Sequence, residues 1–103
     1  MKRIAIPTSV TTIKTSAFSS CKSLTSVEIP SNVKSIEEYA FQSCTSLSKV
    51  RFYSQTPPTI GYRPFNNNAD GRKIYVPKES VDKYKNTNTH WRDYVDDIVG
   101  YTW

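Results

Sequence analysis

The sequence predicts an α/β repeat solenoid, in which short coils stack to form a parallel sheet and a C-terminal helical cap closes the stack. The first observation is a block of residues that recurs at an offset of 23 positions. The second is the alternation of apolar and polar residues over a few positions within each block, which is typical of a short strand. The third is a change in composition after Pro77, from Ser/Thr-rich to charged and aromatic. Together they predict repeats over residues 1–77 and a cap over residues 78–103, in one structural domain.

Two pairs of segments carry the repeat. Residues 6–13 (Ile-Pro-Thr-Ser-Val-Thr-Thr-Ile) align with residues 29–36 (Ile-Pro-Ser-Asn-Val-Lys-Ser-Ile). Residues 17–24 (Ala-Phe-Ser-Ser-Cys-Lys-Ser-Leu) align with residues 40–47 (Ala-Phe-Gln-Ser-Cys-Thr-Ser-Leu). One such coil cannot bury its apolar residues alone, so the coils must stack.

Each coil is expected to contribute one strand. A period of 20 to 29 residues with the spacing Leu-x-x-Leu-x-Leu is typical of leucine-rich repeats, and here it is read as Leu24-x-x-Val27-x-Ile29. Side chains alternate along a strand, so Val27 and Ile29 point into the coil while Ser26 and Glu28 point outward to the concave face. The equivalent inward positions in the later, degenerate copies are Val50, Phe52, Ile74 and Val76.

The return path of each coil carries the spacing Ala-Phe-x-x-Cys, which predicts a short helical turn on the convex side. Cys21 and Cys44 hold equivalent places in adjacent coils. Their side chains should run parallel, about 4.8 Å apart, whereas a disulfide needs Cβ atoms about 3.8 Å apart. We therefore expect two buried, reduced thiols that pack as small apolar groups.

The segment after Pro77 contains two amphipathic stretches, and both are expected to be helical. One holds Val81 and Tyr84, and the other runs from Trp91 to Ile98. Terminal repeats need a cover, so these aromatic residues favour a cap, with a ligand-binding surface as the alternative. Trp103 has no place in this pattern.

These residues also carry a family resemblance. The pattern Ile-Pro-x-x-Val-x-x-Ile-x-x-x-Ala-Phe-x-x-Cys-x-x-Leu-x-x-Val resembles the BspA-type leucine-rich repeat of bacterial and protist surface proteins, over about residues 4–77. Residues 56–60, residues 73–77 and the aromatic spacing beyond them resemble the family's C-terminal closing region, common in gut Bacteroidetes. The resemblance implies a secreted, extracellular or cell-surface location and a role in adhesion or host-protein binding. Because the chain starts within a repeat, we interpret Met1 as an internal or artificial start.

The composition of the chain argues against several classes of function. With 103 residues, of which 37% are apolar, the chain has room for one core. It has no apolar run long enough for membrane insertion or a signal peptide. The net charge of +5 permits nucleic-acid binding, but the 14 basic residues are scattered and match no nucleic-acid-binding motif. Nucleic-acid binding is therefore the least favoured alternative.

No catalytic, metal or cofactor site is expected, which argues against an enzyme. His90 is the only histidine, and no nucleophile motif lies near it. The run Asn66-x-Asn68-x-Asp70-Gly71 has one carboxylate, and Pro77 stands where a calcium loop needs a bidentate Glu. A turn is the favoured interpretation of this run, and a calcium loop is the alternative.

The strand register predicts a candidate binding surface of two outward columns. One column holds Arg3, Ser26, Lys49 and Lys73, and the next holds Ala5, Glu28, Arg51 and Tyr75. Because neighbouring strands lie roughly 5 Å apart, the basic residues form a contiguous patch. The candidate ligand-binding residues are Arg3, Glu28, Lys49, Arg51, Lys73 and Tyr75. Their expected partner is a protein or an acidic glycan, and the alternative is that the charges only keep an exposed sheet soluble.

The sequence thus predicts a non-enzymatic module for protein-protein interaction or adhesion at the cell surface. The alternative function is a purely structural C-terminal cap of a longer repeat stalk. The first coil has no coil before it, which predicts self-association through this apolar end and its unpaired strand. Its apolar residues are Ile4, Ile6, Val10, Ile13 and Phe18.

Overall fold

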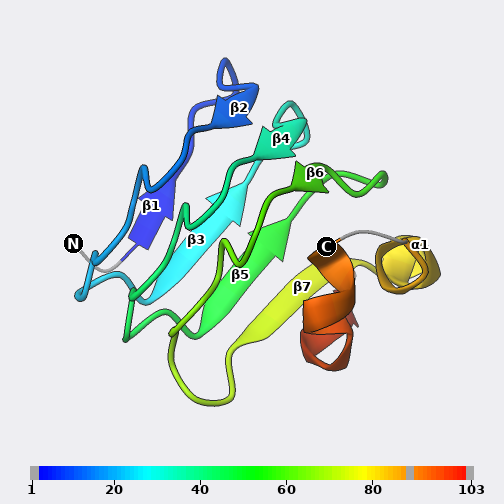
Figure 1. The fold of residues 1–103 in the computed structure, drawn as a ribbon. Coiled ribbons are helices and arrows are strands. Elements are labelled where there is room, and N and C mark those ends of the chain that lie inside the picture. Colours follow the sequence, from blue (N-terminus) through cyan, green and yellow to red (C-terminus); the bar gives the residue numbers. More distant parts are fainter. Residues whose placement is uncertain (1–2, 88–89, 102–103) are drawn as a thin grey trace.

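The computed structural model describes residues 3–87 and 90–101, and its main feature is a five-stranded parallel sheet. The strand order is β1-β3-β5-β7-β8. Figure 1 shows each coil lying beside the next, so that the strands of successive coils become neighbours. With few helices, this is the repeat α/β fold that the sequence predicts. The strands are β1 (Arg3–Ala5), β3 (Ser26–Ile29), β5 (Lys49–Phe52), β7 (Lys73–Pro77) and β8 (Ile98–Tyr101).

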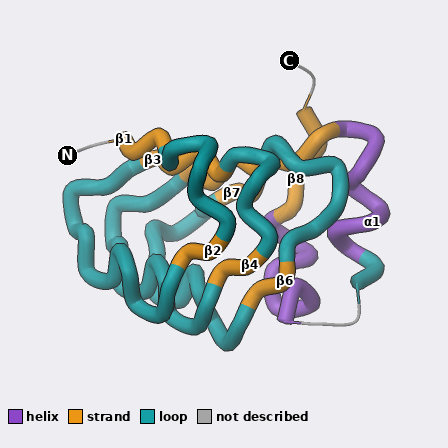
Figure 2. The backbone as a smooth tube through the Cα atoms, turned by 90° about the horizontal axis from the view of Figure 1, so that it is seen from above, coloured by secondary structure: helices purple, strands orange, loops and turns teal. Residues whose placement is uncertain are grey.

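A second parallel sheet, which the sequence did not predict, runs along another side of the coils (Figure 2). It consists of β2 (Thr12–Ile13), β4 (Ser35–Ile36) and β6 (Thr59–Ile60). In each strand the isoleucine is buried. Two residues are too few to show a period, which is why these strands could not be recognised in the sequence.

The predicted helical turn at residues 40–44 is wrong, because this segment is a series of turns. Tyr39 and Ser43 both have positive φ, at 57° and 60°, which no α-helix accommodates. Alternate backbone N–H groups donate to the next coil instead: Phe41 N–H donates to Pro64 O at 2.7 Å, and Ser43 N–H donates to Asn66 O at 2.8 Å. Hydrogen bonds between coils therefore replace those within a helix.

The core lies between the two sheets and contains a stack of phenylalanine rings from successive coils. The rings of Phe18 and Phe41 lie 5.2 Å apart with an interplanar angle of 6°, and those of Phe41 and Phe65 lie 5.6 Å apart at 12°. Val27, Val50 and Ile74, which share one register level, are fully buried. The inward positions of the strands are thus committed to packing.

Both cysteines are free, in agreement with the expected absence of a bridge between them. Cys44 is buried and its thiol donates a hydrogen bond to Phe18 O at 3.1 Å. Burial raises the pKa of the Cys44 thiol. Cys21 is only half-buried, because no described coil covers its outer side.

The C-terminal segment is less helical than predicted. It contains a 3-10 helix (Lys78–Ser80), the α-helix α1 (Val81–Lys85) and a second 3-10 helix (His90–Asp97). Ile98, expected at the end of a helix, is the first residue of β8 and pairs in parallel with Ile74. Joining the sheet satisfies its backbone groups and still buries its side chain, which decides against a helix. Trp103 lies outside the described residues.

Buried aromatic side chains attach this segment to the coils. The Tyr84 hydroxyl donates to Ser54 O at 2.6 Å, and Trp91 Nε1–H donates to Pro58 O at 2.8 Å. Both rings are at most 1% exposed. These rings therefore cover the end of the core and do not form an exposed ligand-binding surface.

An arginine ties the last coil to the end of the second 3-10 helix. Arg72 donates to Phe65 O at 2.6 Å and to Asp97 Oδ2 at 2.5 Å. Its guanidinium also lies 5.0 Å from the centre of the Tyr94 ring. Arg72 also donates to Asn68 Oδ1 at 3.2 Å, and this bond helps to position the turn at residues 66–71.

Candidate functional site

The outward positions of the five-stranded sheet form a continuous surface, which we call the outer sheet face. The strands pair in the register that the sequence predicted: Arg3 with Ser26, Ser26 with Lys49, and Lys49 with Lys73. In the next column Glu28 pairs with Arg51, and Arg51 with Tyr75. The sheet therefore brings the six candidate residues onto one face. Whether they bind a ligand stays a prediction.

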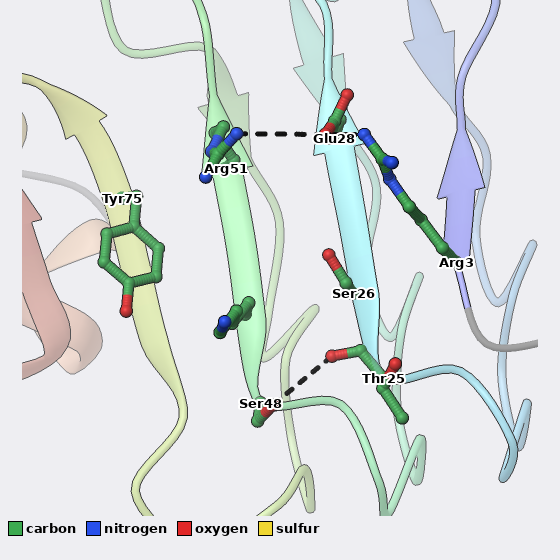
Figure 3. A pocket seen from close by; sticks show the side chains of 8 residues that line it. Arg3, Thr25, Ser26, Glu28, Ser48, Arg51 and Tyr75 are labelled. Carbon is green, nitrogen blue, oxygen red and sulfur yellow. Dashed lines mark hydrogen bonds and ion pairs between the residues drawn. The ribbon is translucent and has the colours of Figure 1, made fainter. Parts of the chain in front are cut away.

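A shallow depression of about 420 Å³ lies in the outer sheet face, and Figure 3 shows the side chains around it. Five of the six candidate residues line it, and Lys73 does not. Three small hydroxyl residues leave space between the longer side chains. The lining residues are Arg3, Thr25, Ser26, Glu28, Ser48, Lys49, Arg51 and Tyr75.

Glu28 forms ion pairs with two arginines, one from each neighbouring strand (Figure 3). Arg3 forms a hydrogen-bonded ion pair with Glu28, and Arg51 Nη1 lies 3.9 Å from the Glu28 carboxylate. The Glu28 side chain is only 19% exposed. The carboxylate therefore offsets part of the charge of both arginines.

Two tyrosines that the sequence analysis missed complete the surroundings of Arg51. The Arg51 guanidinium lies 5.5 Å from the centre of the Tyr101 ring, within the range of a cation-π contact. A hydrogen bond with Tyr53 is the main cause that raises the pKa of Arg51, so this side chain stays charged. Tyr101 donates to Phe52 O at 2.7 Å. Tyr101 belongs to β8, a strand that could not be recognised in the sequence. Tyr53 directly follows β5, so the sequence did contain a signal that it lies near Arg51.

The two lysines of the outer sheet face, unlike its arginines, form no ion pair with Glu28. Lys49 and Lys73 are register partners on neighbouring strands, and both are exposed. Within residues 3–87 and 90–101, the acidic groups that form ion pairs contact arginines and neither lysine. The outer sheet face therefore combines an arginine–glutamate network with two lysines that form no ion pair with an acidic group of the described residues.

The other sequence candidates do not come together as a reactive site. His90 lies with its ring 6.0 Å from that of Tyr62, at an exposed position. Residues 66–71 form turns, with Asn67 and Gly71 at positive φ. In the described part of the chain, no three His, Cys, Asp or Glu side chains converge as metal ligands. None of the helices described there has the length and apolar character needed to cross a membrane.

Comparison with known families gives a match over most of the chain. The model of the BspA type leucine rich repeat region matches residues 1–89, in six copies. No curated protein matches the sequence. This family is associated with repeat modules for protein interaction. Because the match covers most of the sequence and the parallel coils agree with it, the chain belongs to the BspA-type leucine-rich repeat family.

Proposed function

We propose that this chain is a non-enzymatic module of a repeat solenoid, that it binds another protein through its outer sheet face, and that it serves adhesion at a bacterial cell surface. The observation that carries the proposal is the ordered set of basic and aromatic side chains around the depression. Arginine and tyrosine are the residue types enriched where proteins bind one another.

The surface has the features of a binding site that is organised before its partner arrives. Arg51 contacts Glu28, Tyr53 and Tyr101, and these contacts reduce the side-chain entropy that it would lose on binding. The inward side chains of the same strands are buried and unable to contact a partner. The cell-surface location rests on the usual location of the family's members.

Binding to immobilised extracellular-matrix proteins and acidic glycans, at physiological salt, tests the proposal. The variant Lys49→Glu/Arg51→Glu/Lys73→Glu should lose saturable binding to a protein ligand. The matched control Lys14→Glu/Lys22→Glu/Lys34→Glu makes the same change in net charge at exposed positions outside the outer sheet face. Equal loss in both variants would mean that net charge alone drives binding, and the proposal would fail.

A structural role as the closing end of a longer repeat stalk is the second candidate. The buried contacts of Tyr84 and Trp91 with the last coils favour it. It predicts that the triple charge reversal changes no binding, whereas removal of residues 78–103 unfolds the repeats. Circular dichroism of the shortened chain measures this directly.

A further inference from the structure

The lysine pair of the outer sheet face is an unfavourable arrangement in the absence of a partner. Lys49 and Lys73 face each other across neighbouring parallel strands, whose spacing is about 4.8 Å. Like charges directly opposite in a sheet repel each other. Glu28, the acidic residue of this face, lies nearer to Arg3 and Arg51, with which it forms its ion pairs. An anion placed over the two lysines would relieve the repulsion.

On β7 and β8 the next level of this face is apolar, whereas on β5 it holds Arg51. Tyr75 lies two residues beyond Lys73, and its register partner on β8 is Val99. Val99 is 36% exposed, which makes it one of two large hydrophobic residues on the surface of the described chain. Two residues along a strand correspond to about 6.7 Å. The surface is therefore cationic over β5 and β7 at the level of Lys49 and Lys73, and apolar over β7 and β8 at the level of Tyr75 and Val99.

We infer that these four residues, the Lys49–Lys73–Tyr75–Val99 patch, bind an extended polypeptide segment in which a carboxylate side chain and an apolar side chain stand two residues apart. Side chains two residues apart in an extended chain point the same way and are also about 6.7 Å apart. Along β7 the carboxylate then lies at Lys73, with Lys49 on the neighbouring strand, and the apolar side chain lies at Tyr75, with Val99 on the other neighbouring strand. The inference rests on the proposed function and specifies the chemistry of the protein partner.

A polypeptide fits this patch better than a uniformly charged polymer such as a sulfated glycan. Glu28 lies next to the lysine column and would repel closely spaced anionic groups. The charges of Arg3 and Arg51 are already shared with Glu28. A dense polyanion would also place charged groups against Val99, where no favourable contact compensates their desolvation.

Fluorescence anisotropy of labelled synthetic peptides with the whole chain tests the inference. The parent peptide contains the core Glu-Thr-Phe between Ser/Thr flanks, and matched peptides contain Gln-Thr-Phe or Glu-Thr-Ser. We expect each matched peptide to bind about fivefold more weakly than the parent, in line with the loss of one good contact. The variant Lys49→Glu/Lys73→Glu should weaken parent binding at least about tenfold and remove the preference for Glu over Gln.

Two further variants separate the contacts from general effects. Val99→Ser should reduce the preference for Phe over Ser in the peptide and leave the preference for Glu over Gln intact. The control Lys14→Glu/Lys22→Glu has the same net charge as the lysine variant and should bind the parent peptide like the unchanged chain. Circular dichroism establishes that each variant is folded.

The outcomes distinguish this inference from the proposed function. Equal affinity for all three peptides, or equal loss in the control variant, overturns the inference. If matrix proteins still bind through the outer sheet face in that case, the proposed function survives without it. Binding of heparin that depends on Lys49 and Lys73, with no peptide binding, overturns the polypeptide assignment in favour of a sulfated glycan. Absence of any protein or peptide binding overturns both.

Discussion

At the scale of single residues, the outer sheet face contains a pair of like charges that is expected to lower stability. Lys49 and Lys73 are exposed register partners of like charge. Opposed like charges destabilise a sheet, and threonine suits a strand better than lysine does. A residue that costs stability at an exposed position is the kind of feature that functional surfaces retain.

The variant Lys73→Thr is therefore expected to raise the free energy of unfolding, by about 0.5 kcal/mol. Urea unfolding measures the change, and the gain should shrink at high salt, because salt screens exposed charges. Lys22→Thr is the control, since Lys22 lies in an exposed turn with no lysine opposite it. A lower free energy of unfolding in Lys73→Thr would contradict the repulsion.

At the scale of elements, the stack of phenylalanine rings holds the return segments of the coils together. Phe41 is fully buried between Phe18 and Phe65, whereas Phe18 is half-buried at the end of the stack. The return segments are turns with only short-range hydrogen bonds of their own, so this packing and the bonds between coils contribute much of their stability.

Replacing Phe41 by alanine should lower the free energy of unfolding by about 4 kcal/mol, because it leaves a cavity between two rings that cannot both collapse into it. Phe18→Ala removes the same atoms at the end of the stack and should cost less than half of that. Thermal and urea unfolding of both variants give the comparison. Equal losses of unfolding free energy in the two variants would show that Phe41 gains nothing from its position between two rings.

The C-terminal elements give the fold a characteristic pH dependence. Burial raises the pKa of Tyr84 and of Tyr94 above the ordinary tyrosine value. A raised pKa in the folded state means that the folded chain keeps these protons when the unfolded chain loses them. Their contribution to stability is therefore complete below about pH 10 and is lost progressively as the pH rises above it.

The free energy of unfolding should accordingly fall above about pH 10, with a slope that approaches about 1.4 kcal/mol per pH unit for each tyrosine that stays protonated in the folded chain. Urea unfolding between about pH 9 and about pH 11 measures the slope. Tyr84→Phe should reduce the slope by one tyrosine's share, whatever it does to the stability at neutral pH. An unchanged slope in this variant would show that Tyr84 does not couple ionisation to folding.

At the scale of the whole molecule, the two ends of the stack are unlike. Tyr84, Trp91 and Ile98 cover the core at the C-terminal end. At the other end β1 is the outermost strand of the described sheet, and Ile4 and Phe18 are only half-buried. Outer strands with apolar neighbours are prone to pair with other chains.

Self-association through this end remains a prediction, with the β1 side of one molecule facing that of another. Sedimentation velocity should show a sedimentation coefficient that increases with concentration. Ile4→Lys places a charge at the contact and should keep the chain monomeric, whereas Lys83→Glu, at the opposite end, should not. A monomer at every concentration for the unchanged chain would contradict the prediction.

The sequence by itself determined the repeat period, the inward and outward sides of β3, β5 and β7, and hence the columns in which Lys49 pairs with Lys73 and Arg51 with Tyr75. It could do so because strand side chains alternate strictly and the repeat fixes which strands are neighbours. Only the tertiary structure decided the two-residue strands of the second sheet and the turns at residues 40–44. There the backbone hydrogen bonds to another coil, and no local pattern encodes that partner. The same reason applies to β8, where pairing with β7 overrode a helical pattern and added Val99 and Tyr101 to the outer sheet face.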